Sequence, residues 1–65
     1  MYVLWSSHGR YLASITFVPG GTVRNFVSDP EVAMKFEDKS ACYSMLLTMA
    51  FSGVETYDFE IHEFI

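Results

Sequence analysis

The sequence predicts an α+β fold, in which an antiparallel sheet of three or four strands carries one long helix on one face. Three observations predict it: several short segments alternate apolar and polar side chains, turn-forming residues separate them, and one long uncharged segment has apolar residues at helical spacing. Apolar residues make up 51% of the 65 residues and charged residues 18%, a balance typical of folded chains. We expect a single compact domain spanning residues 1–65.

The N-terminal residues predict a β-hairpin. Tyr2–Trp5 is rich in aromatic and β-branched residues, and Ser6–Gly9 has the composition of a turn. In the strand that follows, apolar residues alternate with others. This alternation places Tyr11, Ile15 and Phe17 on the side of the strand that faces the core.

Two further segments are expected to complete the sheet. Pro19–Gly21 is a turn, and Thr22–Val27 returns to β character. Because the connections are short, the first three strands should form an antiparallel meander. Near the C-terminus, Glu55–Ile65 alternates again, with Phe59 and Ile61 on its apolar side. This pattern predicts a last strand with one acidic side.

Two helix starts lie between the third and the last strand. Ser28–Glu31 predicts a short helical turn, because it offers an aspartate cap followed by proline, and also a serine and a glutamate at capping-box spacing. Asp38 is expected to cap a longer helix from Lys39 to about Ser52. Gly53 is expected to end that helix in the left-handed conformation.

The long helix is apolar over more of its surface than one sheet can cover. A stripe at positions i, i+3, i+4 and i+7 suits packing on the sheet: Cys42, Met45, Leu46 and Met49. The predicted core is Tyr11, Ile15, Phe17, Cys42, Leu46, Met49, Phe59 and Ile61. A second side of the helix carries Tyr43, Leu47 and Phe51, which we call the helix flank. Either the short helical turn around Val32 and Phe36 covers the helix flank, or another molecule does.

The chain shows no motif that names a reaction, and we expect a non-enzymatic protein without a cofactor or a metal. The single cysteine, Cys42, excludes an internal disulfide and should be a buried thiol. One cysteine with His8 and His62 does not make a four-ligand zinc set. His8 should lie in a solvated turn. His62, beside Glu60, should make a cross-strand pair or a pH-dependent contact.

Charge and hydropathy limit the expected partners. The net charge of −4 and the scattered basic residues argue against direct binding to nucleic acid. No signal peptide is visible, and the uncharged segment is too short to span a membrane, so we expect a cytoplasmic protein that does not bind a membrane. So small a domain is expected to need a partner, either a basic protein or a second copy in a homodimer. The expected partner-binding residues are Tyr43, Leu47, Phe51, Glu55, Asp58, Glu60, His62 and Glu63. The acidic ones among them either keep the chain soluble or dock on a basic groove.

The chain also resembles small accessory proteins encoded by bacteriophages and prophages. The likeness rests on Gly9-Arg10-Tyr11-Leu12 after the first strand, and on Asp29, Ala33 and Phe36 in the pattern D-x-x-x-A-x-x-F before the helix. The long helix departs from that pattern, since it is more apolar and less charged. The resemblance implies a role in the cytoplasm of an infected host, without a cofactor. It further implies a protein that binds and modulates a host protein, such as a defence protein or one that handles nucleic acid.

Overall fold

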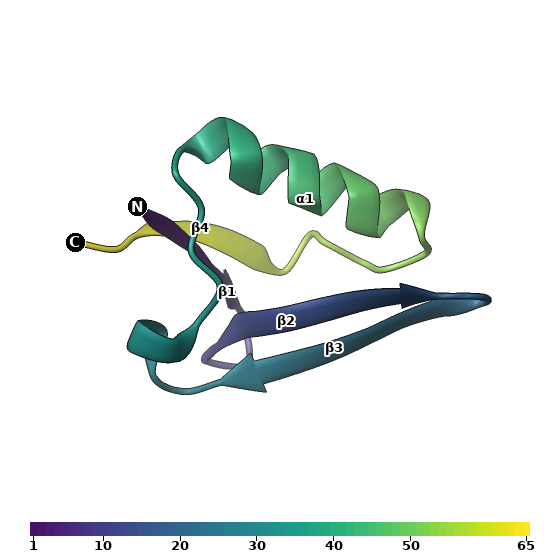
Figure 1. Cartoon of the computed structure of the whole chain (residues 1–65), viewed down its shortest axis with the longest axis horizontal. Helices are drawn as coiled ribbons and strands as arrows, with labels where there is room; N and C mark the ends of the chain where they lie inside the picture. The colour runs from purple at the N-terminus through teal and green to yellow at the C-terminus, as the bar shows by residue number, and fades with distance from the viewer.

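One four-stranded antiparallel sheet and one long helix make up the structure, a computed structural model that describes all 65 residues (Figure 1). Its elements are β1 (Tyr2–Ser6), β2 (Arg10–Val18), β3 (Gly21–Val27), a 3-10 helix (Pro30–Val32), α1 (Lys39–Phe51) and β4 (Phe59–Glu63). The strand order is β3-β2-β1-β4, so that β3 and β4 form the two edges. The predicted α+β class and order of elements are confirmed.

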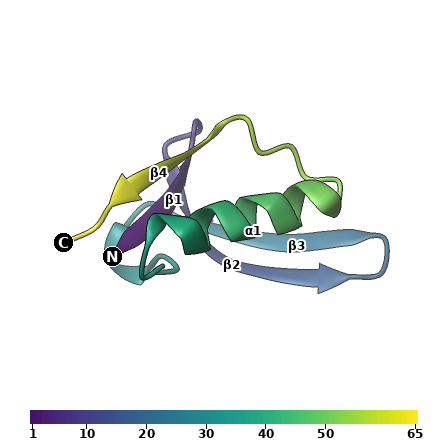
Figure 2. The same ribbon diagram turned by 90° about the horizontal axis from the view of Figure 1, so that it is seen from above.

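The helix α1 forms a second layer on one face of the sheet. It packs chiefly over β1, and the long β2–β3 hairpin extends past its C-terminal end (Figure 1). Seen from above, β4 lies to one side of α1 (Figure 2). One helix therefore covers the middle of the sheet and leaves the hairpin tip without a second layer.

A β-bulge in β2 reverses the alternation of side chains partway along this strand. The pairing of β2 with β3 shifts between Leu12 and Ser14, which leaves Ala13 as the extra residue. Leu12 before the bulge is fully buried, and Ile15 after it also packs against the core. An even-numbered and an odd-numbered residue can share one face of this strand only because the bulge lies between them.

Two residues that the sequence places in the core lie elsewhere. Tyr11 precedes the bulge and is adjacent to Leu12, so it faces the side of the sheet away from α1. There its ring packs against the His62 ring in a T-shaped arrangement, with the centroids 6.4 Å apart. Phe17 lies near the hairpin tip, beyond the cover of α1, and is 44% exposed. The prediction was wrong for both, because it assumed unbroken alternation and a helix that covers the whole strand.

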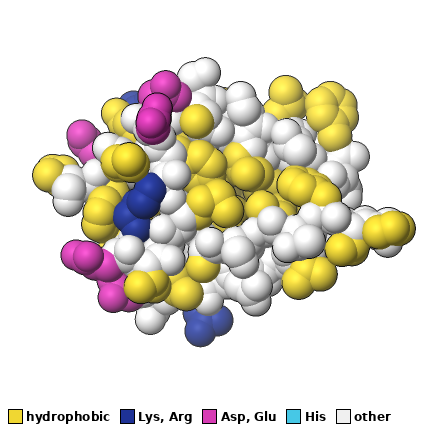
Figure 3. Space-filling model, viewed as in Figure 1, with side chains coloured by type: hydrophobic (Ala, Val, Ile, Leu, Met, Phe, Trp, Pro, Cys, Tyr) yellow, Lys and Arg dark blue, Asp and Glu magenta, His cyan; other side chains and the backbone are white.

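The core joins both layers through one cluster of buried side chains: Leu4, Leu12, Phe36, Cys42 and Met49. Further predicted core residues are partly buried and pack against this cluster: Ile15, Leu46, Phe59 and Ile61. Hydrophobic side chains fill the space between α1 and the β2–β3 hairpin in the space-filling view (Figure 3). The stripe predicted along the helix is therefore the side that packs on the sheet.

Both ends of α1 are capped by the residues that the sequence predicts. The Asp38 side chain accepts a hydrogen bond from the Ala41 N–H at 2.8 Å, and thus caps the first turn. At the other end, Gly53 has a φ of 86°, a conformation that favours glycine. The Val54 N–H donates to the Met49 carbonyl at 3.0 Å, which completes a Schellman motif.

The short helical turn predicted before α1 is present as a 3-10 helix. It spans Pro30–Val32, and Asp29 caps it by accepting a hydrogen bond from the Glu31 N–H at 2.9 Å. The chain then extends, and Phe36 and Tyr2 exchange two backbone hydrogen bonds of 2.8 and 2.9 Å. This segment is therefore tied to β1.

The cap at Asp38 can be tested by substitution. Asp38→Ala removes the acceptor for the Ala41 N–H, and it should lower the free energy of unfolding by about 1 kcal/mol. Urea unfolding followed by circular dichroism measures the loss. Glu37→Ala is the matched control, since the Glu37 side chain is exposed and makes no hydrogen bond; an equal loss in both variants would contradict the assigned cap.

A second pair of variants tests which residues of β2 belong to the core. Leu12→Ala should lower the free energy of unfolding by about 2–5 kcal/mol, because it leaves a cavity in the core. Phe17→Ala should cost clearly less, since the Phe17 side chain is already partly in solvent. Urea titration of both variants measures the difference. A larger loss for Phe17→Ala than for Leu12→Ala would contradict this assignment of the core.

Candidate protein-binding surface

The helix flank is the largest group of exposed apolar side chains on α1. Tyr43 is 62% exposed, Leu47 59% and Phe51 84%. Residues four apart on an α-helix lie on the same side, so the three side chains are neighbours. Cys42 and Met49 on the opposite side of the same helix are fully buried. The helix therefore has two apolar sides, of which the sheet covers one.

The chain does not cover the helix flank itself. Val32 in the 3-10 helix is 63% exposed, and Phe36 is held against β1. Of the two alternatives that the sequence leaves open, coverage by the short helical turn is therefore wrong. The remaining side of α1 carries small polar residues, among them Thr48, whose hydroxyl donates to the Ser44 carbonyl at 2.9 Å.

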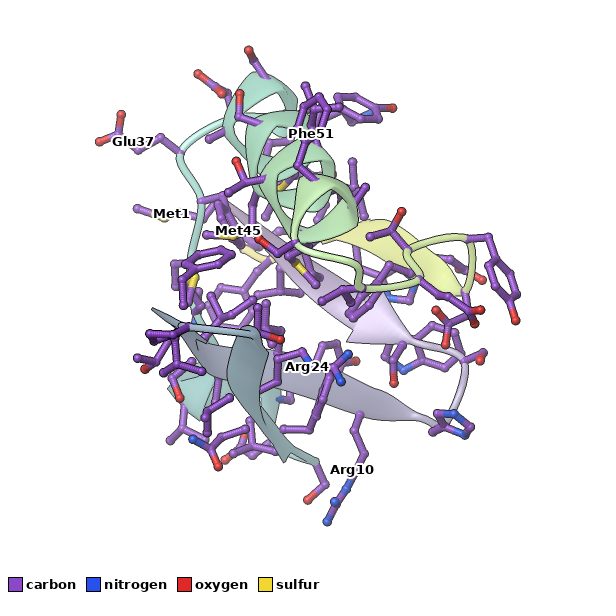
Figure 4. The ribbon with its side chains drawn as sticks, turned by 90° about the vertical axis from the view of Figure 1, so that its right-hand side faces the viewer. Met1, Arg10, Arg24, Glu37, Met45 and Phe51 are labelled. Carbon is purple, nitrogen blue, oxygen red and sulfur yellow. The ribbon has the colours of Figure 1, made fainter.

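The helix flank extends from the side of α1 next to β4 to the outer side of the helix. Figure 4 looks along α1 from its C-terminal end, with Met45 to the left of the helix, Phe51 at its top and β4 to its right. At about 100° per residue, Tyr43 lies between the buried side and Phe51, opposite Met45. Tyr43 therefore lies on the side of α1 next to β4, and Leu47 lies between Tyr43 and Phe51.

The acidic residues do not form one continuous face. The sequence predicts Glu55 and Asp58 on the last strand. This is wrong, because β4 begins only at Phe59 and both residues lie in the loop between α1 and β4. Glu60 and His62 share the sheet face away from α1, and Glu63 alternates to the other face. The predicted acidic side of the last strand is thus reduced to one carboxylate beside a histidine.

His62 belongs to an aromatic cluster on the sheet face away from α1. Its ring stacks on Trp5 of β1, with centroids 5.2 Å apart and 14° between the planes. Tyr11 of β2 meets the His62 ring edge-on. Nε2 of His62 lies 3.0 Å from Oε1 of Glu60 in the same strand. The cross-strand contact predicted for His62 is therefore confirmed, with aromatic partners.

A polar groove that the sequence interpretation missed lies between the hairpin tip and the loop before β4. It has a volume of about 520 Å³, and Arg24, Glu55 and Asp58 line it. A neighbouring hollow of about 400 Å³ shares these residues and adds His8 and Arg10. Figure 4 shows that Arg10 and Arg24 lie on the same side of the molecule. The lining side chains are distant in the sequence, and only the fold brings them together. Both hollows are open and carry charges of both signs.

Cys42 is placed as an inert thiol and not as a nucleophile. Its side chain is fully buried between α1 and the sheet. Burial raises the pKa of the Cys42 thiol, and the nearby Asp38 carboxylate raises it further. A raised pKa keeps the thiol protonated, whereas reactive cysteines have a lowered one. No group of three or more His, Cys, Asp or Glu residues in the chain is arranged to hold a metal ion.

Comparison with known proteins finds no relative: no model of a protein family, no curated protein and no solved structure matches this chain. The resemblance to bacteriophage accessory proteins therefore stays a prediction. None of the helices has the length and apolar character needed to cross a membrane. The function is therefore inferred from the exposed helix flank.

The buried thiol predicts a pH dependence of stability. Because the pKa of Cys42 is raised in the folded state, the unfolded state loses this proton first as the pH rises through the ordinary value of 9.0. The unfolded state then binds fewer protons, and the free energy of unfolding falls as the pH rises. Cys42→Ala should lack this part of the decline, which begins near pH 9.0, in urea titrations. Parallel curves for both proteins would contradict the assignment.

Proposed function

We propose that this chain is a non-enzymatic protein-binding module whose contact surface is the helix flank. One observation carries the proposal: Tyr43, Leu47 and Phe51 are exposed side by side on a helix whose other apolar side is fully used in the core. Grouped apolar side chains on a soluble protein mark an interaction surface. Their burial contributes about 25 cal/mol per Å², which adds up to several kcal/mol for three large side chains.

The partner class follows from the charge around this surface. The chain carries a net charge of −4. Glu55 is exposed in the loop before β4, and Glu63 is exposed on the face of β4 that carries α1, whereas Glu60 lies on the opposite face. A basic protein surface complements this arrangement and is steered toward it. The resemblance noted in the sequence supplies a setting, in which an accessory protein of a bacteriophage binds and modulates a host protein.

Self-association is the second candidate. The observation that favours it is the position of β4, which is an edge strand next to the helix flank. A second copy of the chain could reach both features at once. In that case assembly itself would be the role of the protein.

A pair of adjacent helix residues tests the proposed surface. Tyr43→Glu places a charge in the helix flank, whereas Ser44→Glu adds the same charge to the exposed neighbouring side of α1. Tyr43→Glu should reduce capture of the partner at least about tenfold, because a central aromatic residue of an interface contributes more than about 1.4 kcal/mol. Quantitative mass spectrometry of proteins captured from lysate measures this.

The Ser44→Glu control and circular dichroism show whether a loss of capture is specific to the helix flank. Ser44→Glu should capture the same proteins as the unsubstituted chain, and circular dichroism should be unchanged in both variants. Asp58→Lys combined with Glu60→Lys should weaken capture further if the partner is basic. Equal capture by Tyr43→Glu and Ser44→Glu would remove the helix flank from the interface.

A further inference from the structure

The outer edge of β4 is open. β4 pairs with β1 on one side, and no strand pairs with it on the other. An open strand edge presents backbone N–H and C=O groups that can pair with another chain. The other edge strand, β3, carries Arg24 as its only charged residue and so offers no opposite charges for pairing with itself.

The backbone hydrogen bonds at both ends of β4 show which residues direct their N–H and C=O groups away from β1, toward the open edge. The Phe64 N–H donates to the Met1 carbonyl at 2.7 Å, and the Ser7 N–H donates to the Asp58 carbonyl at 3.0 Å. Even-numbered residues of this segment thus direct their backbone groups toward β1. Backbone direction alternates along an antiparallel strand, so the odd-numbered residues direct theirs to the open edge.

The open edge therefore has a defined set of donors and acceptors. Phe59, Ile61 and Glu63 each present a carbonyl oxygen to the outside. The Phe59 N–H already donates to the Thr56 carbonyl at 3.1 Å, which leaves the N–H groups of Ile61 and Glu63 as donors.

We propose that β4 pairs in antiparallel fashion with β4 of a second copy of this chain, about a two-fold axis at Ile61. In this register Ile61 exchanges two hydrogen bonds with Ile61 of the second copy. Each Glu63 N–H donates to the Phe59 carbonyl of the other copy. The arrangement uses every free donor of the edge and does not need the Phe59 N–H, which is already occupied.

The side chains of β4 select this register. A centre at Ile61 places Glu60 opposite His62 of the second copy, twice, in positions without ladder hydrogen bonds, where opposed side chains are closest. A carboxylate accepts a hydrogen bond from an imidazole N–H, so each pair is complementary. A shift by two residues would oppose either Glu60 to Glu60 or His62 to His62. Such like pairs are unfavourable or neutral at best.

The pairing would also organise the helix flanks. Edge pairing about a two-fold axis joins the two sheets into one of eight strands, with both α1 helices on the same face. Because each helix flank begins on the side of α1 next to β4, the two flanks would lie on either side of the axis. This inference rests on the second candidate function, self-association, and it holds whichever other protein binds to the flanks.

Two single substitutions to cysteine test both the pairing and its register. Chains with Glu60→Cys and chains with His62→Cys, carrying tags of different length, are mixed and oxidised. Residues opposed in such a pair have Cα atoms about 4.5 Å apart, within the range that a disulfide spans. We expect mixed disulfides, which join one variant to the other, to exceed both like-with-like products. The unsubstituted chain is the control, because its own Cys42 is fully buried.

A variant without added thiols gives an independent measurement. Glu63→Pro removes the outward N–H at the last residue of β4, a position where an edge strand tolerates proline. It should abolish the dimer in light scattering at unchanged circular dichroism, while Tyr43→Glu should leave the β4 disulfide intact. Dominant like-with-like disulfides would overturn the register. A strictly monomeric unsubstituted chain at high micromolar concentration would overturn the pairing, without bearing on capture by the helix flank.

Discussion

The structure depends on a mismatch between the apolar surface of α1 and the area that a four-stranded sheet can cover. Cys42 and Met49 join the helix to the sheet and are fully buried. The same helix carries the helix flank on a side that no other element reaches. A chain of this size has no third layer to close that side. The uncovered flank follows from the size of the fold, and it is the feature on which the proposed function rests.

The class and order of the elements could be predicted from the sequence, because periodicity and turn residues act locally. The caps at Asp38 and Gly53 are examples of such local signals. The side assignment in β2 could not be predicted, since the bulge at Ala13 depends on pairing with β3 and leaves no trace in the alternation. For the same reason Leu12 was missed as a core residue and Tyr11 was placed on the wrong face.

The candidate surface was predictable in one part and not in another. The exposure of Leu47 and its neighbours follows from the helical wheel, once the sheet is known to cover one side only. The predicted last strand was too long and carried too many acidic residues. The alternation continues into the loop at Asp58, although β4 begins at Phe59. The polar groove around Arg24 arises from the approach of the hairpin to that loop, which no local pattern encodes.

The pairing of β1 with β4 has a consequence for the order of folding. Leu4 lies opposite Ile61, so the strand that pairs with the outer side of β1 comes from the far end of the sequence. Closing so long a loop costs more entropy than forming the neighbouring β2–β3 hairpin. The hairpin can therefore assemble early, whereas docking of β4 is a late event. Until then β1 has a free edge, and association between incompletely folded chains competes with native closure.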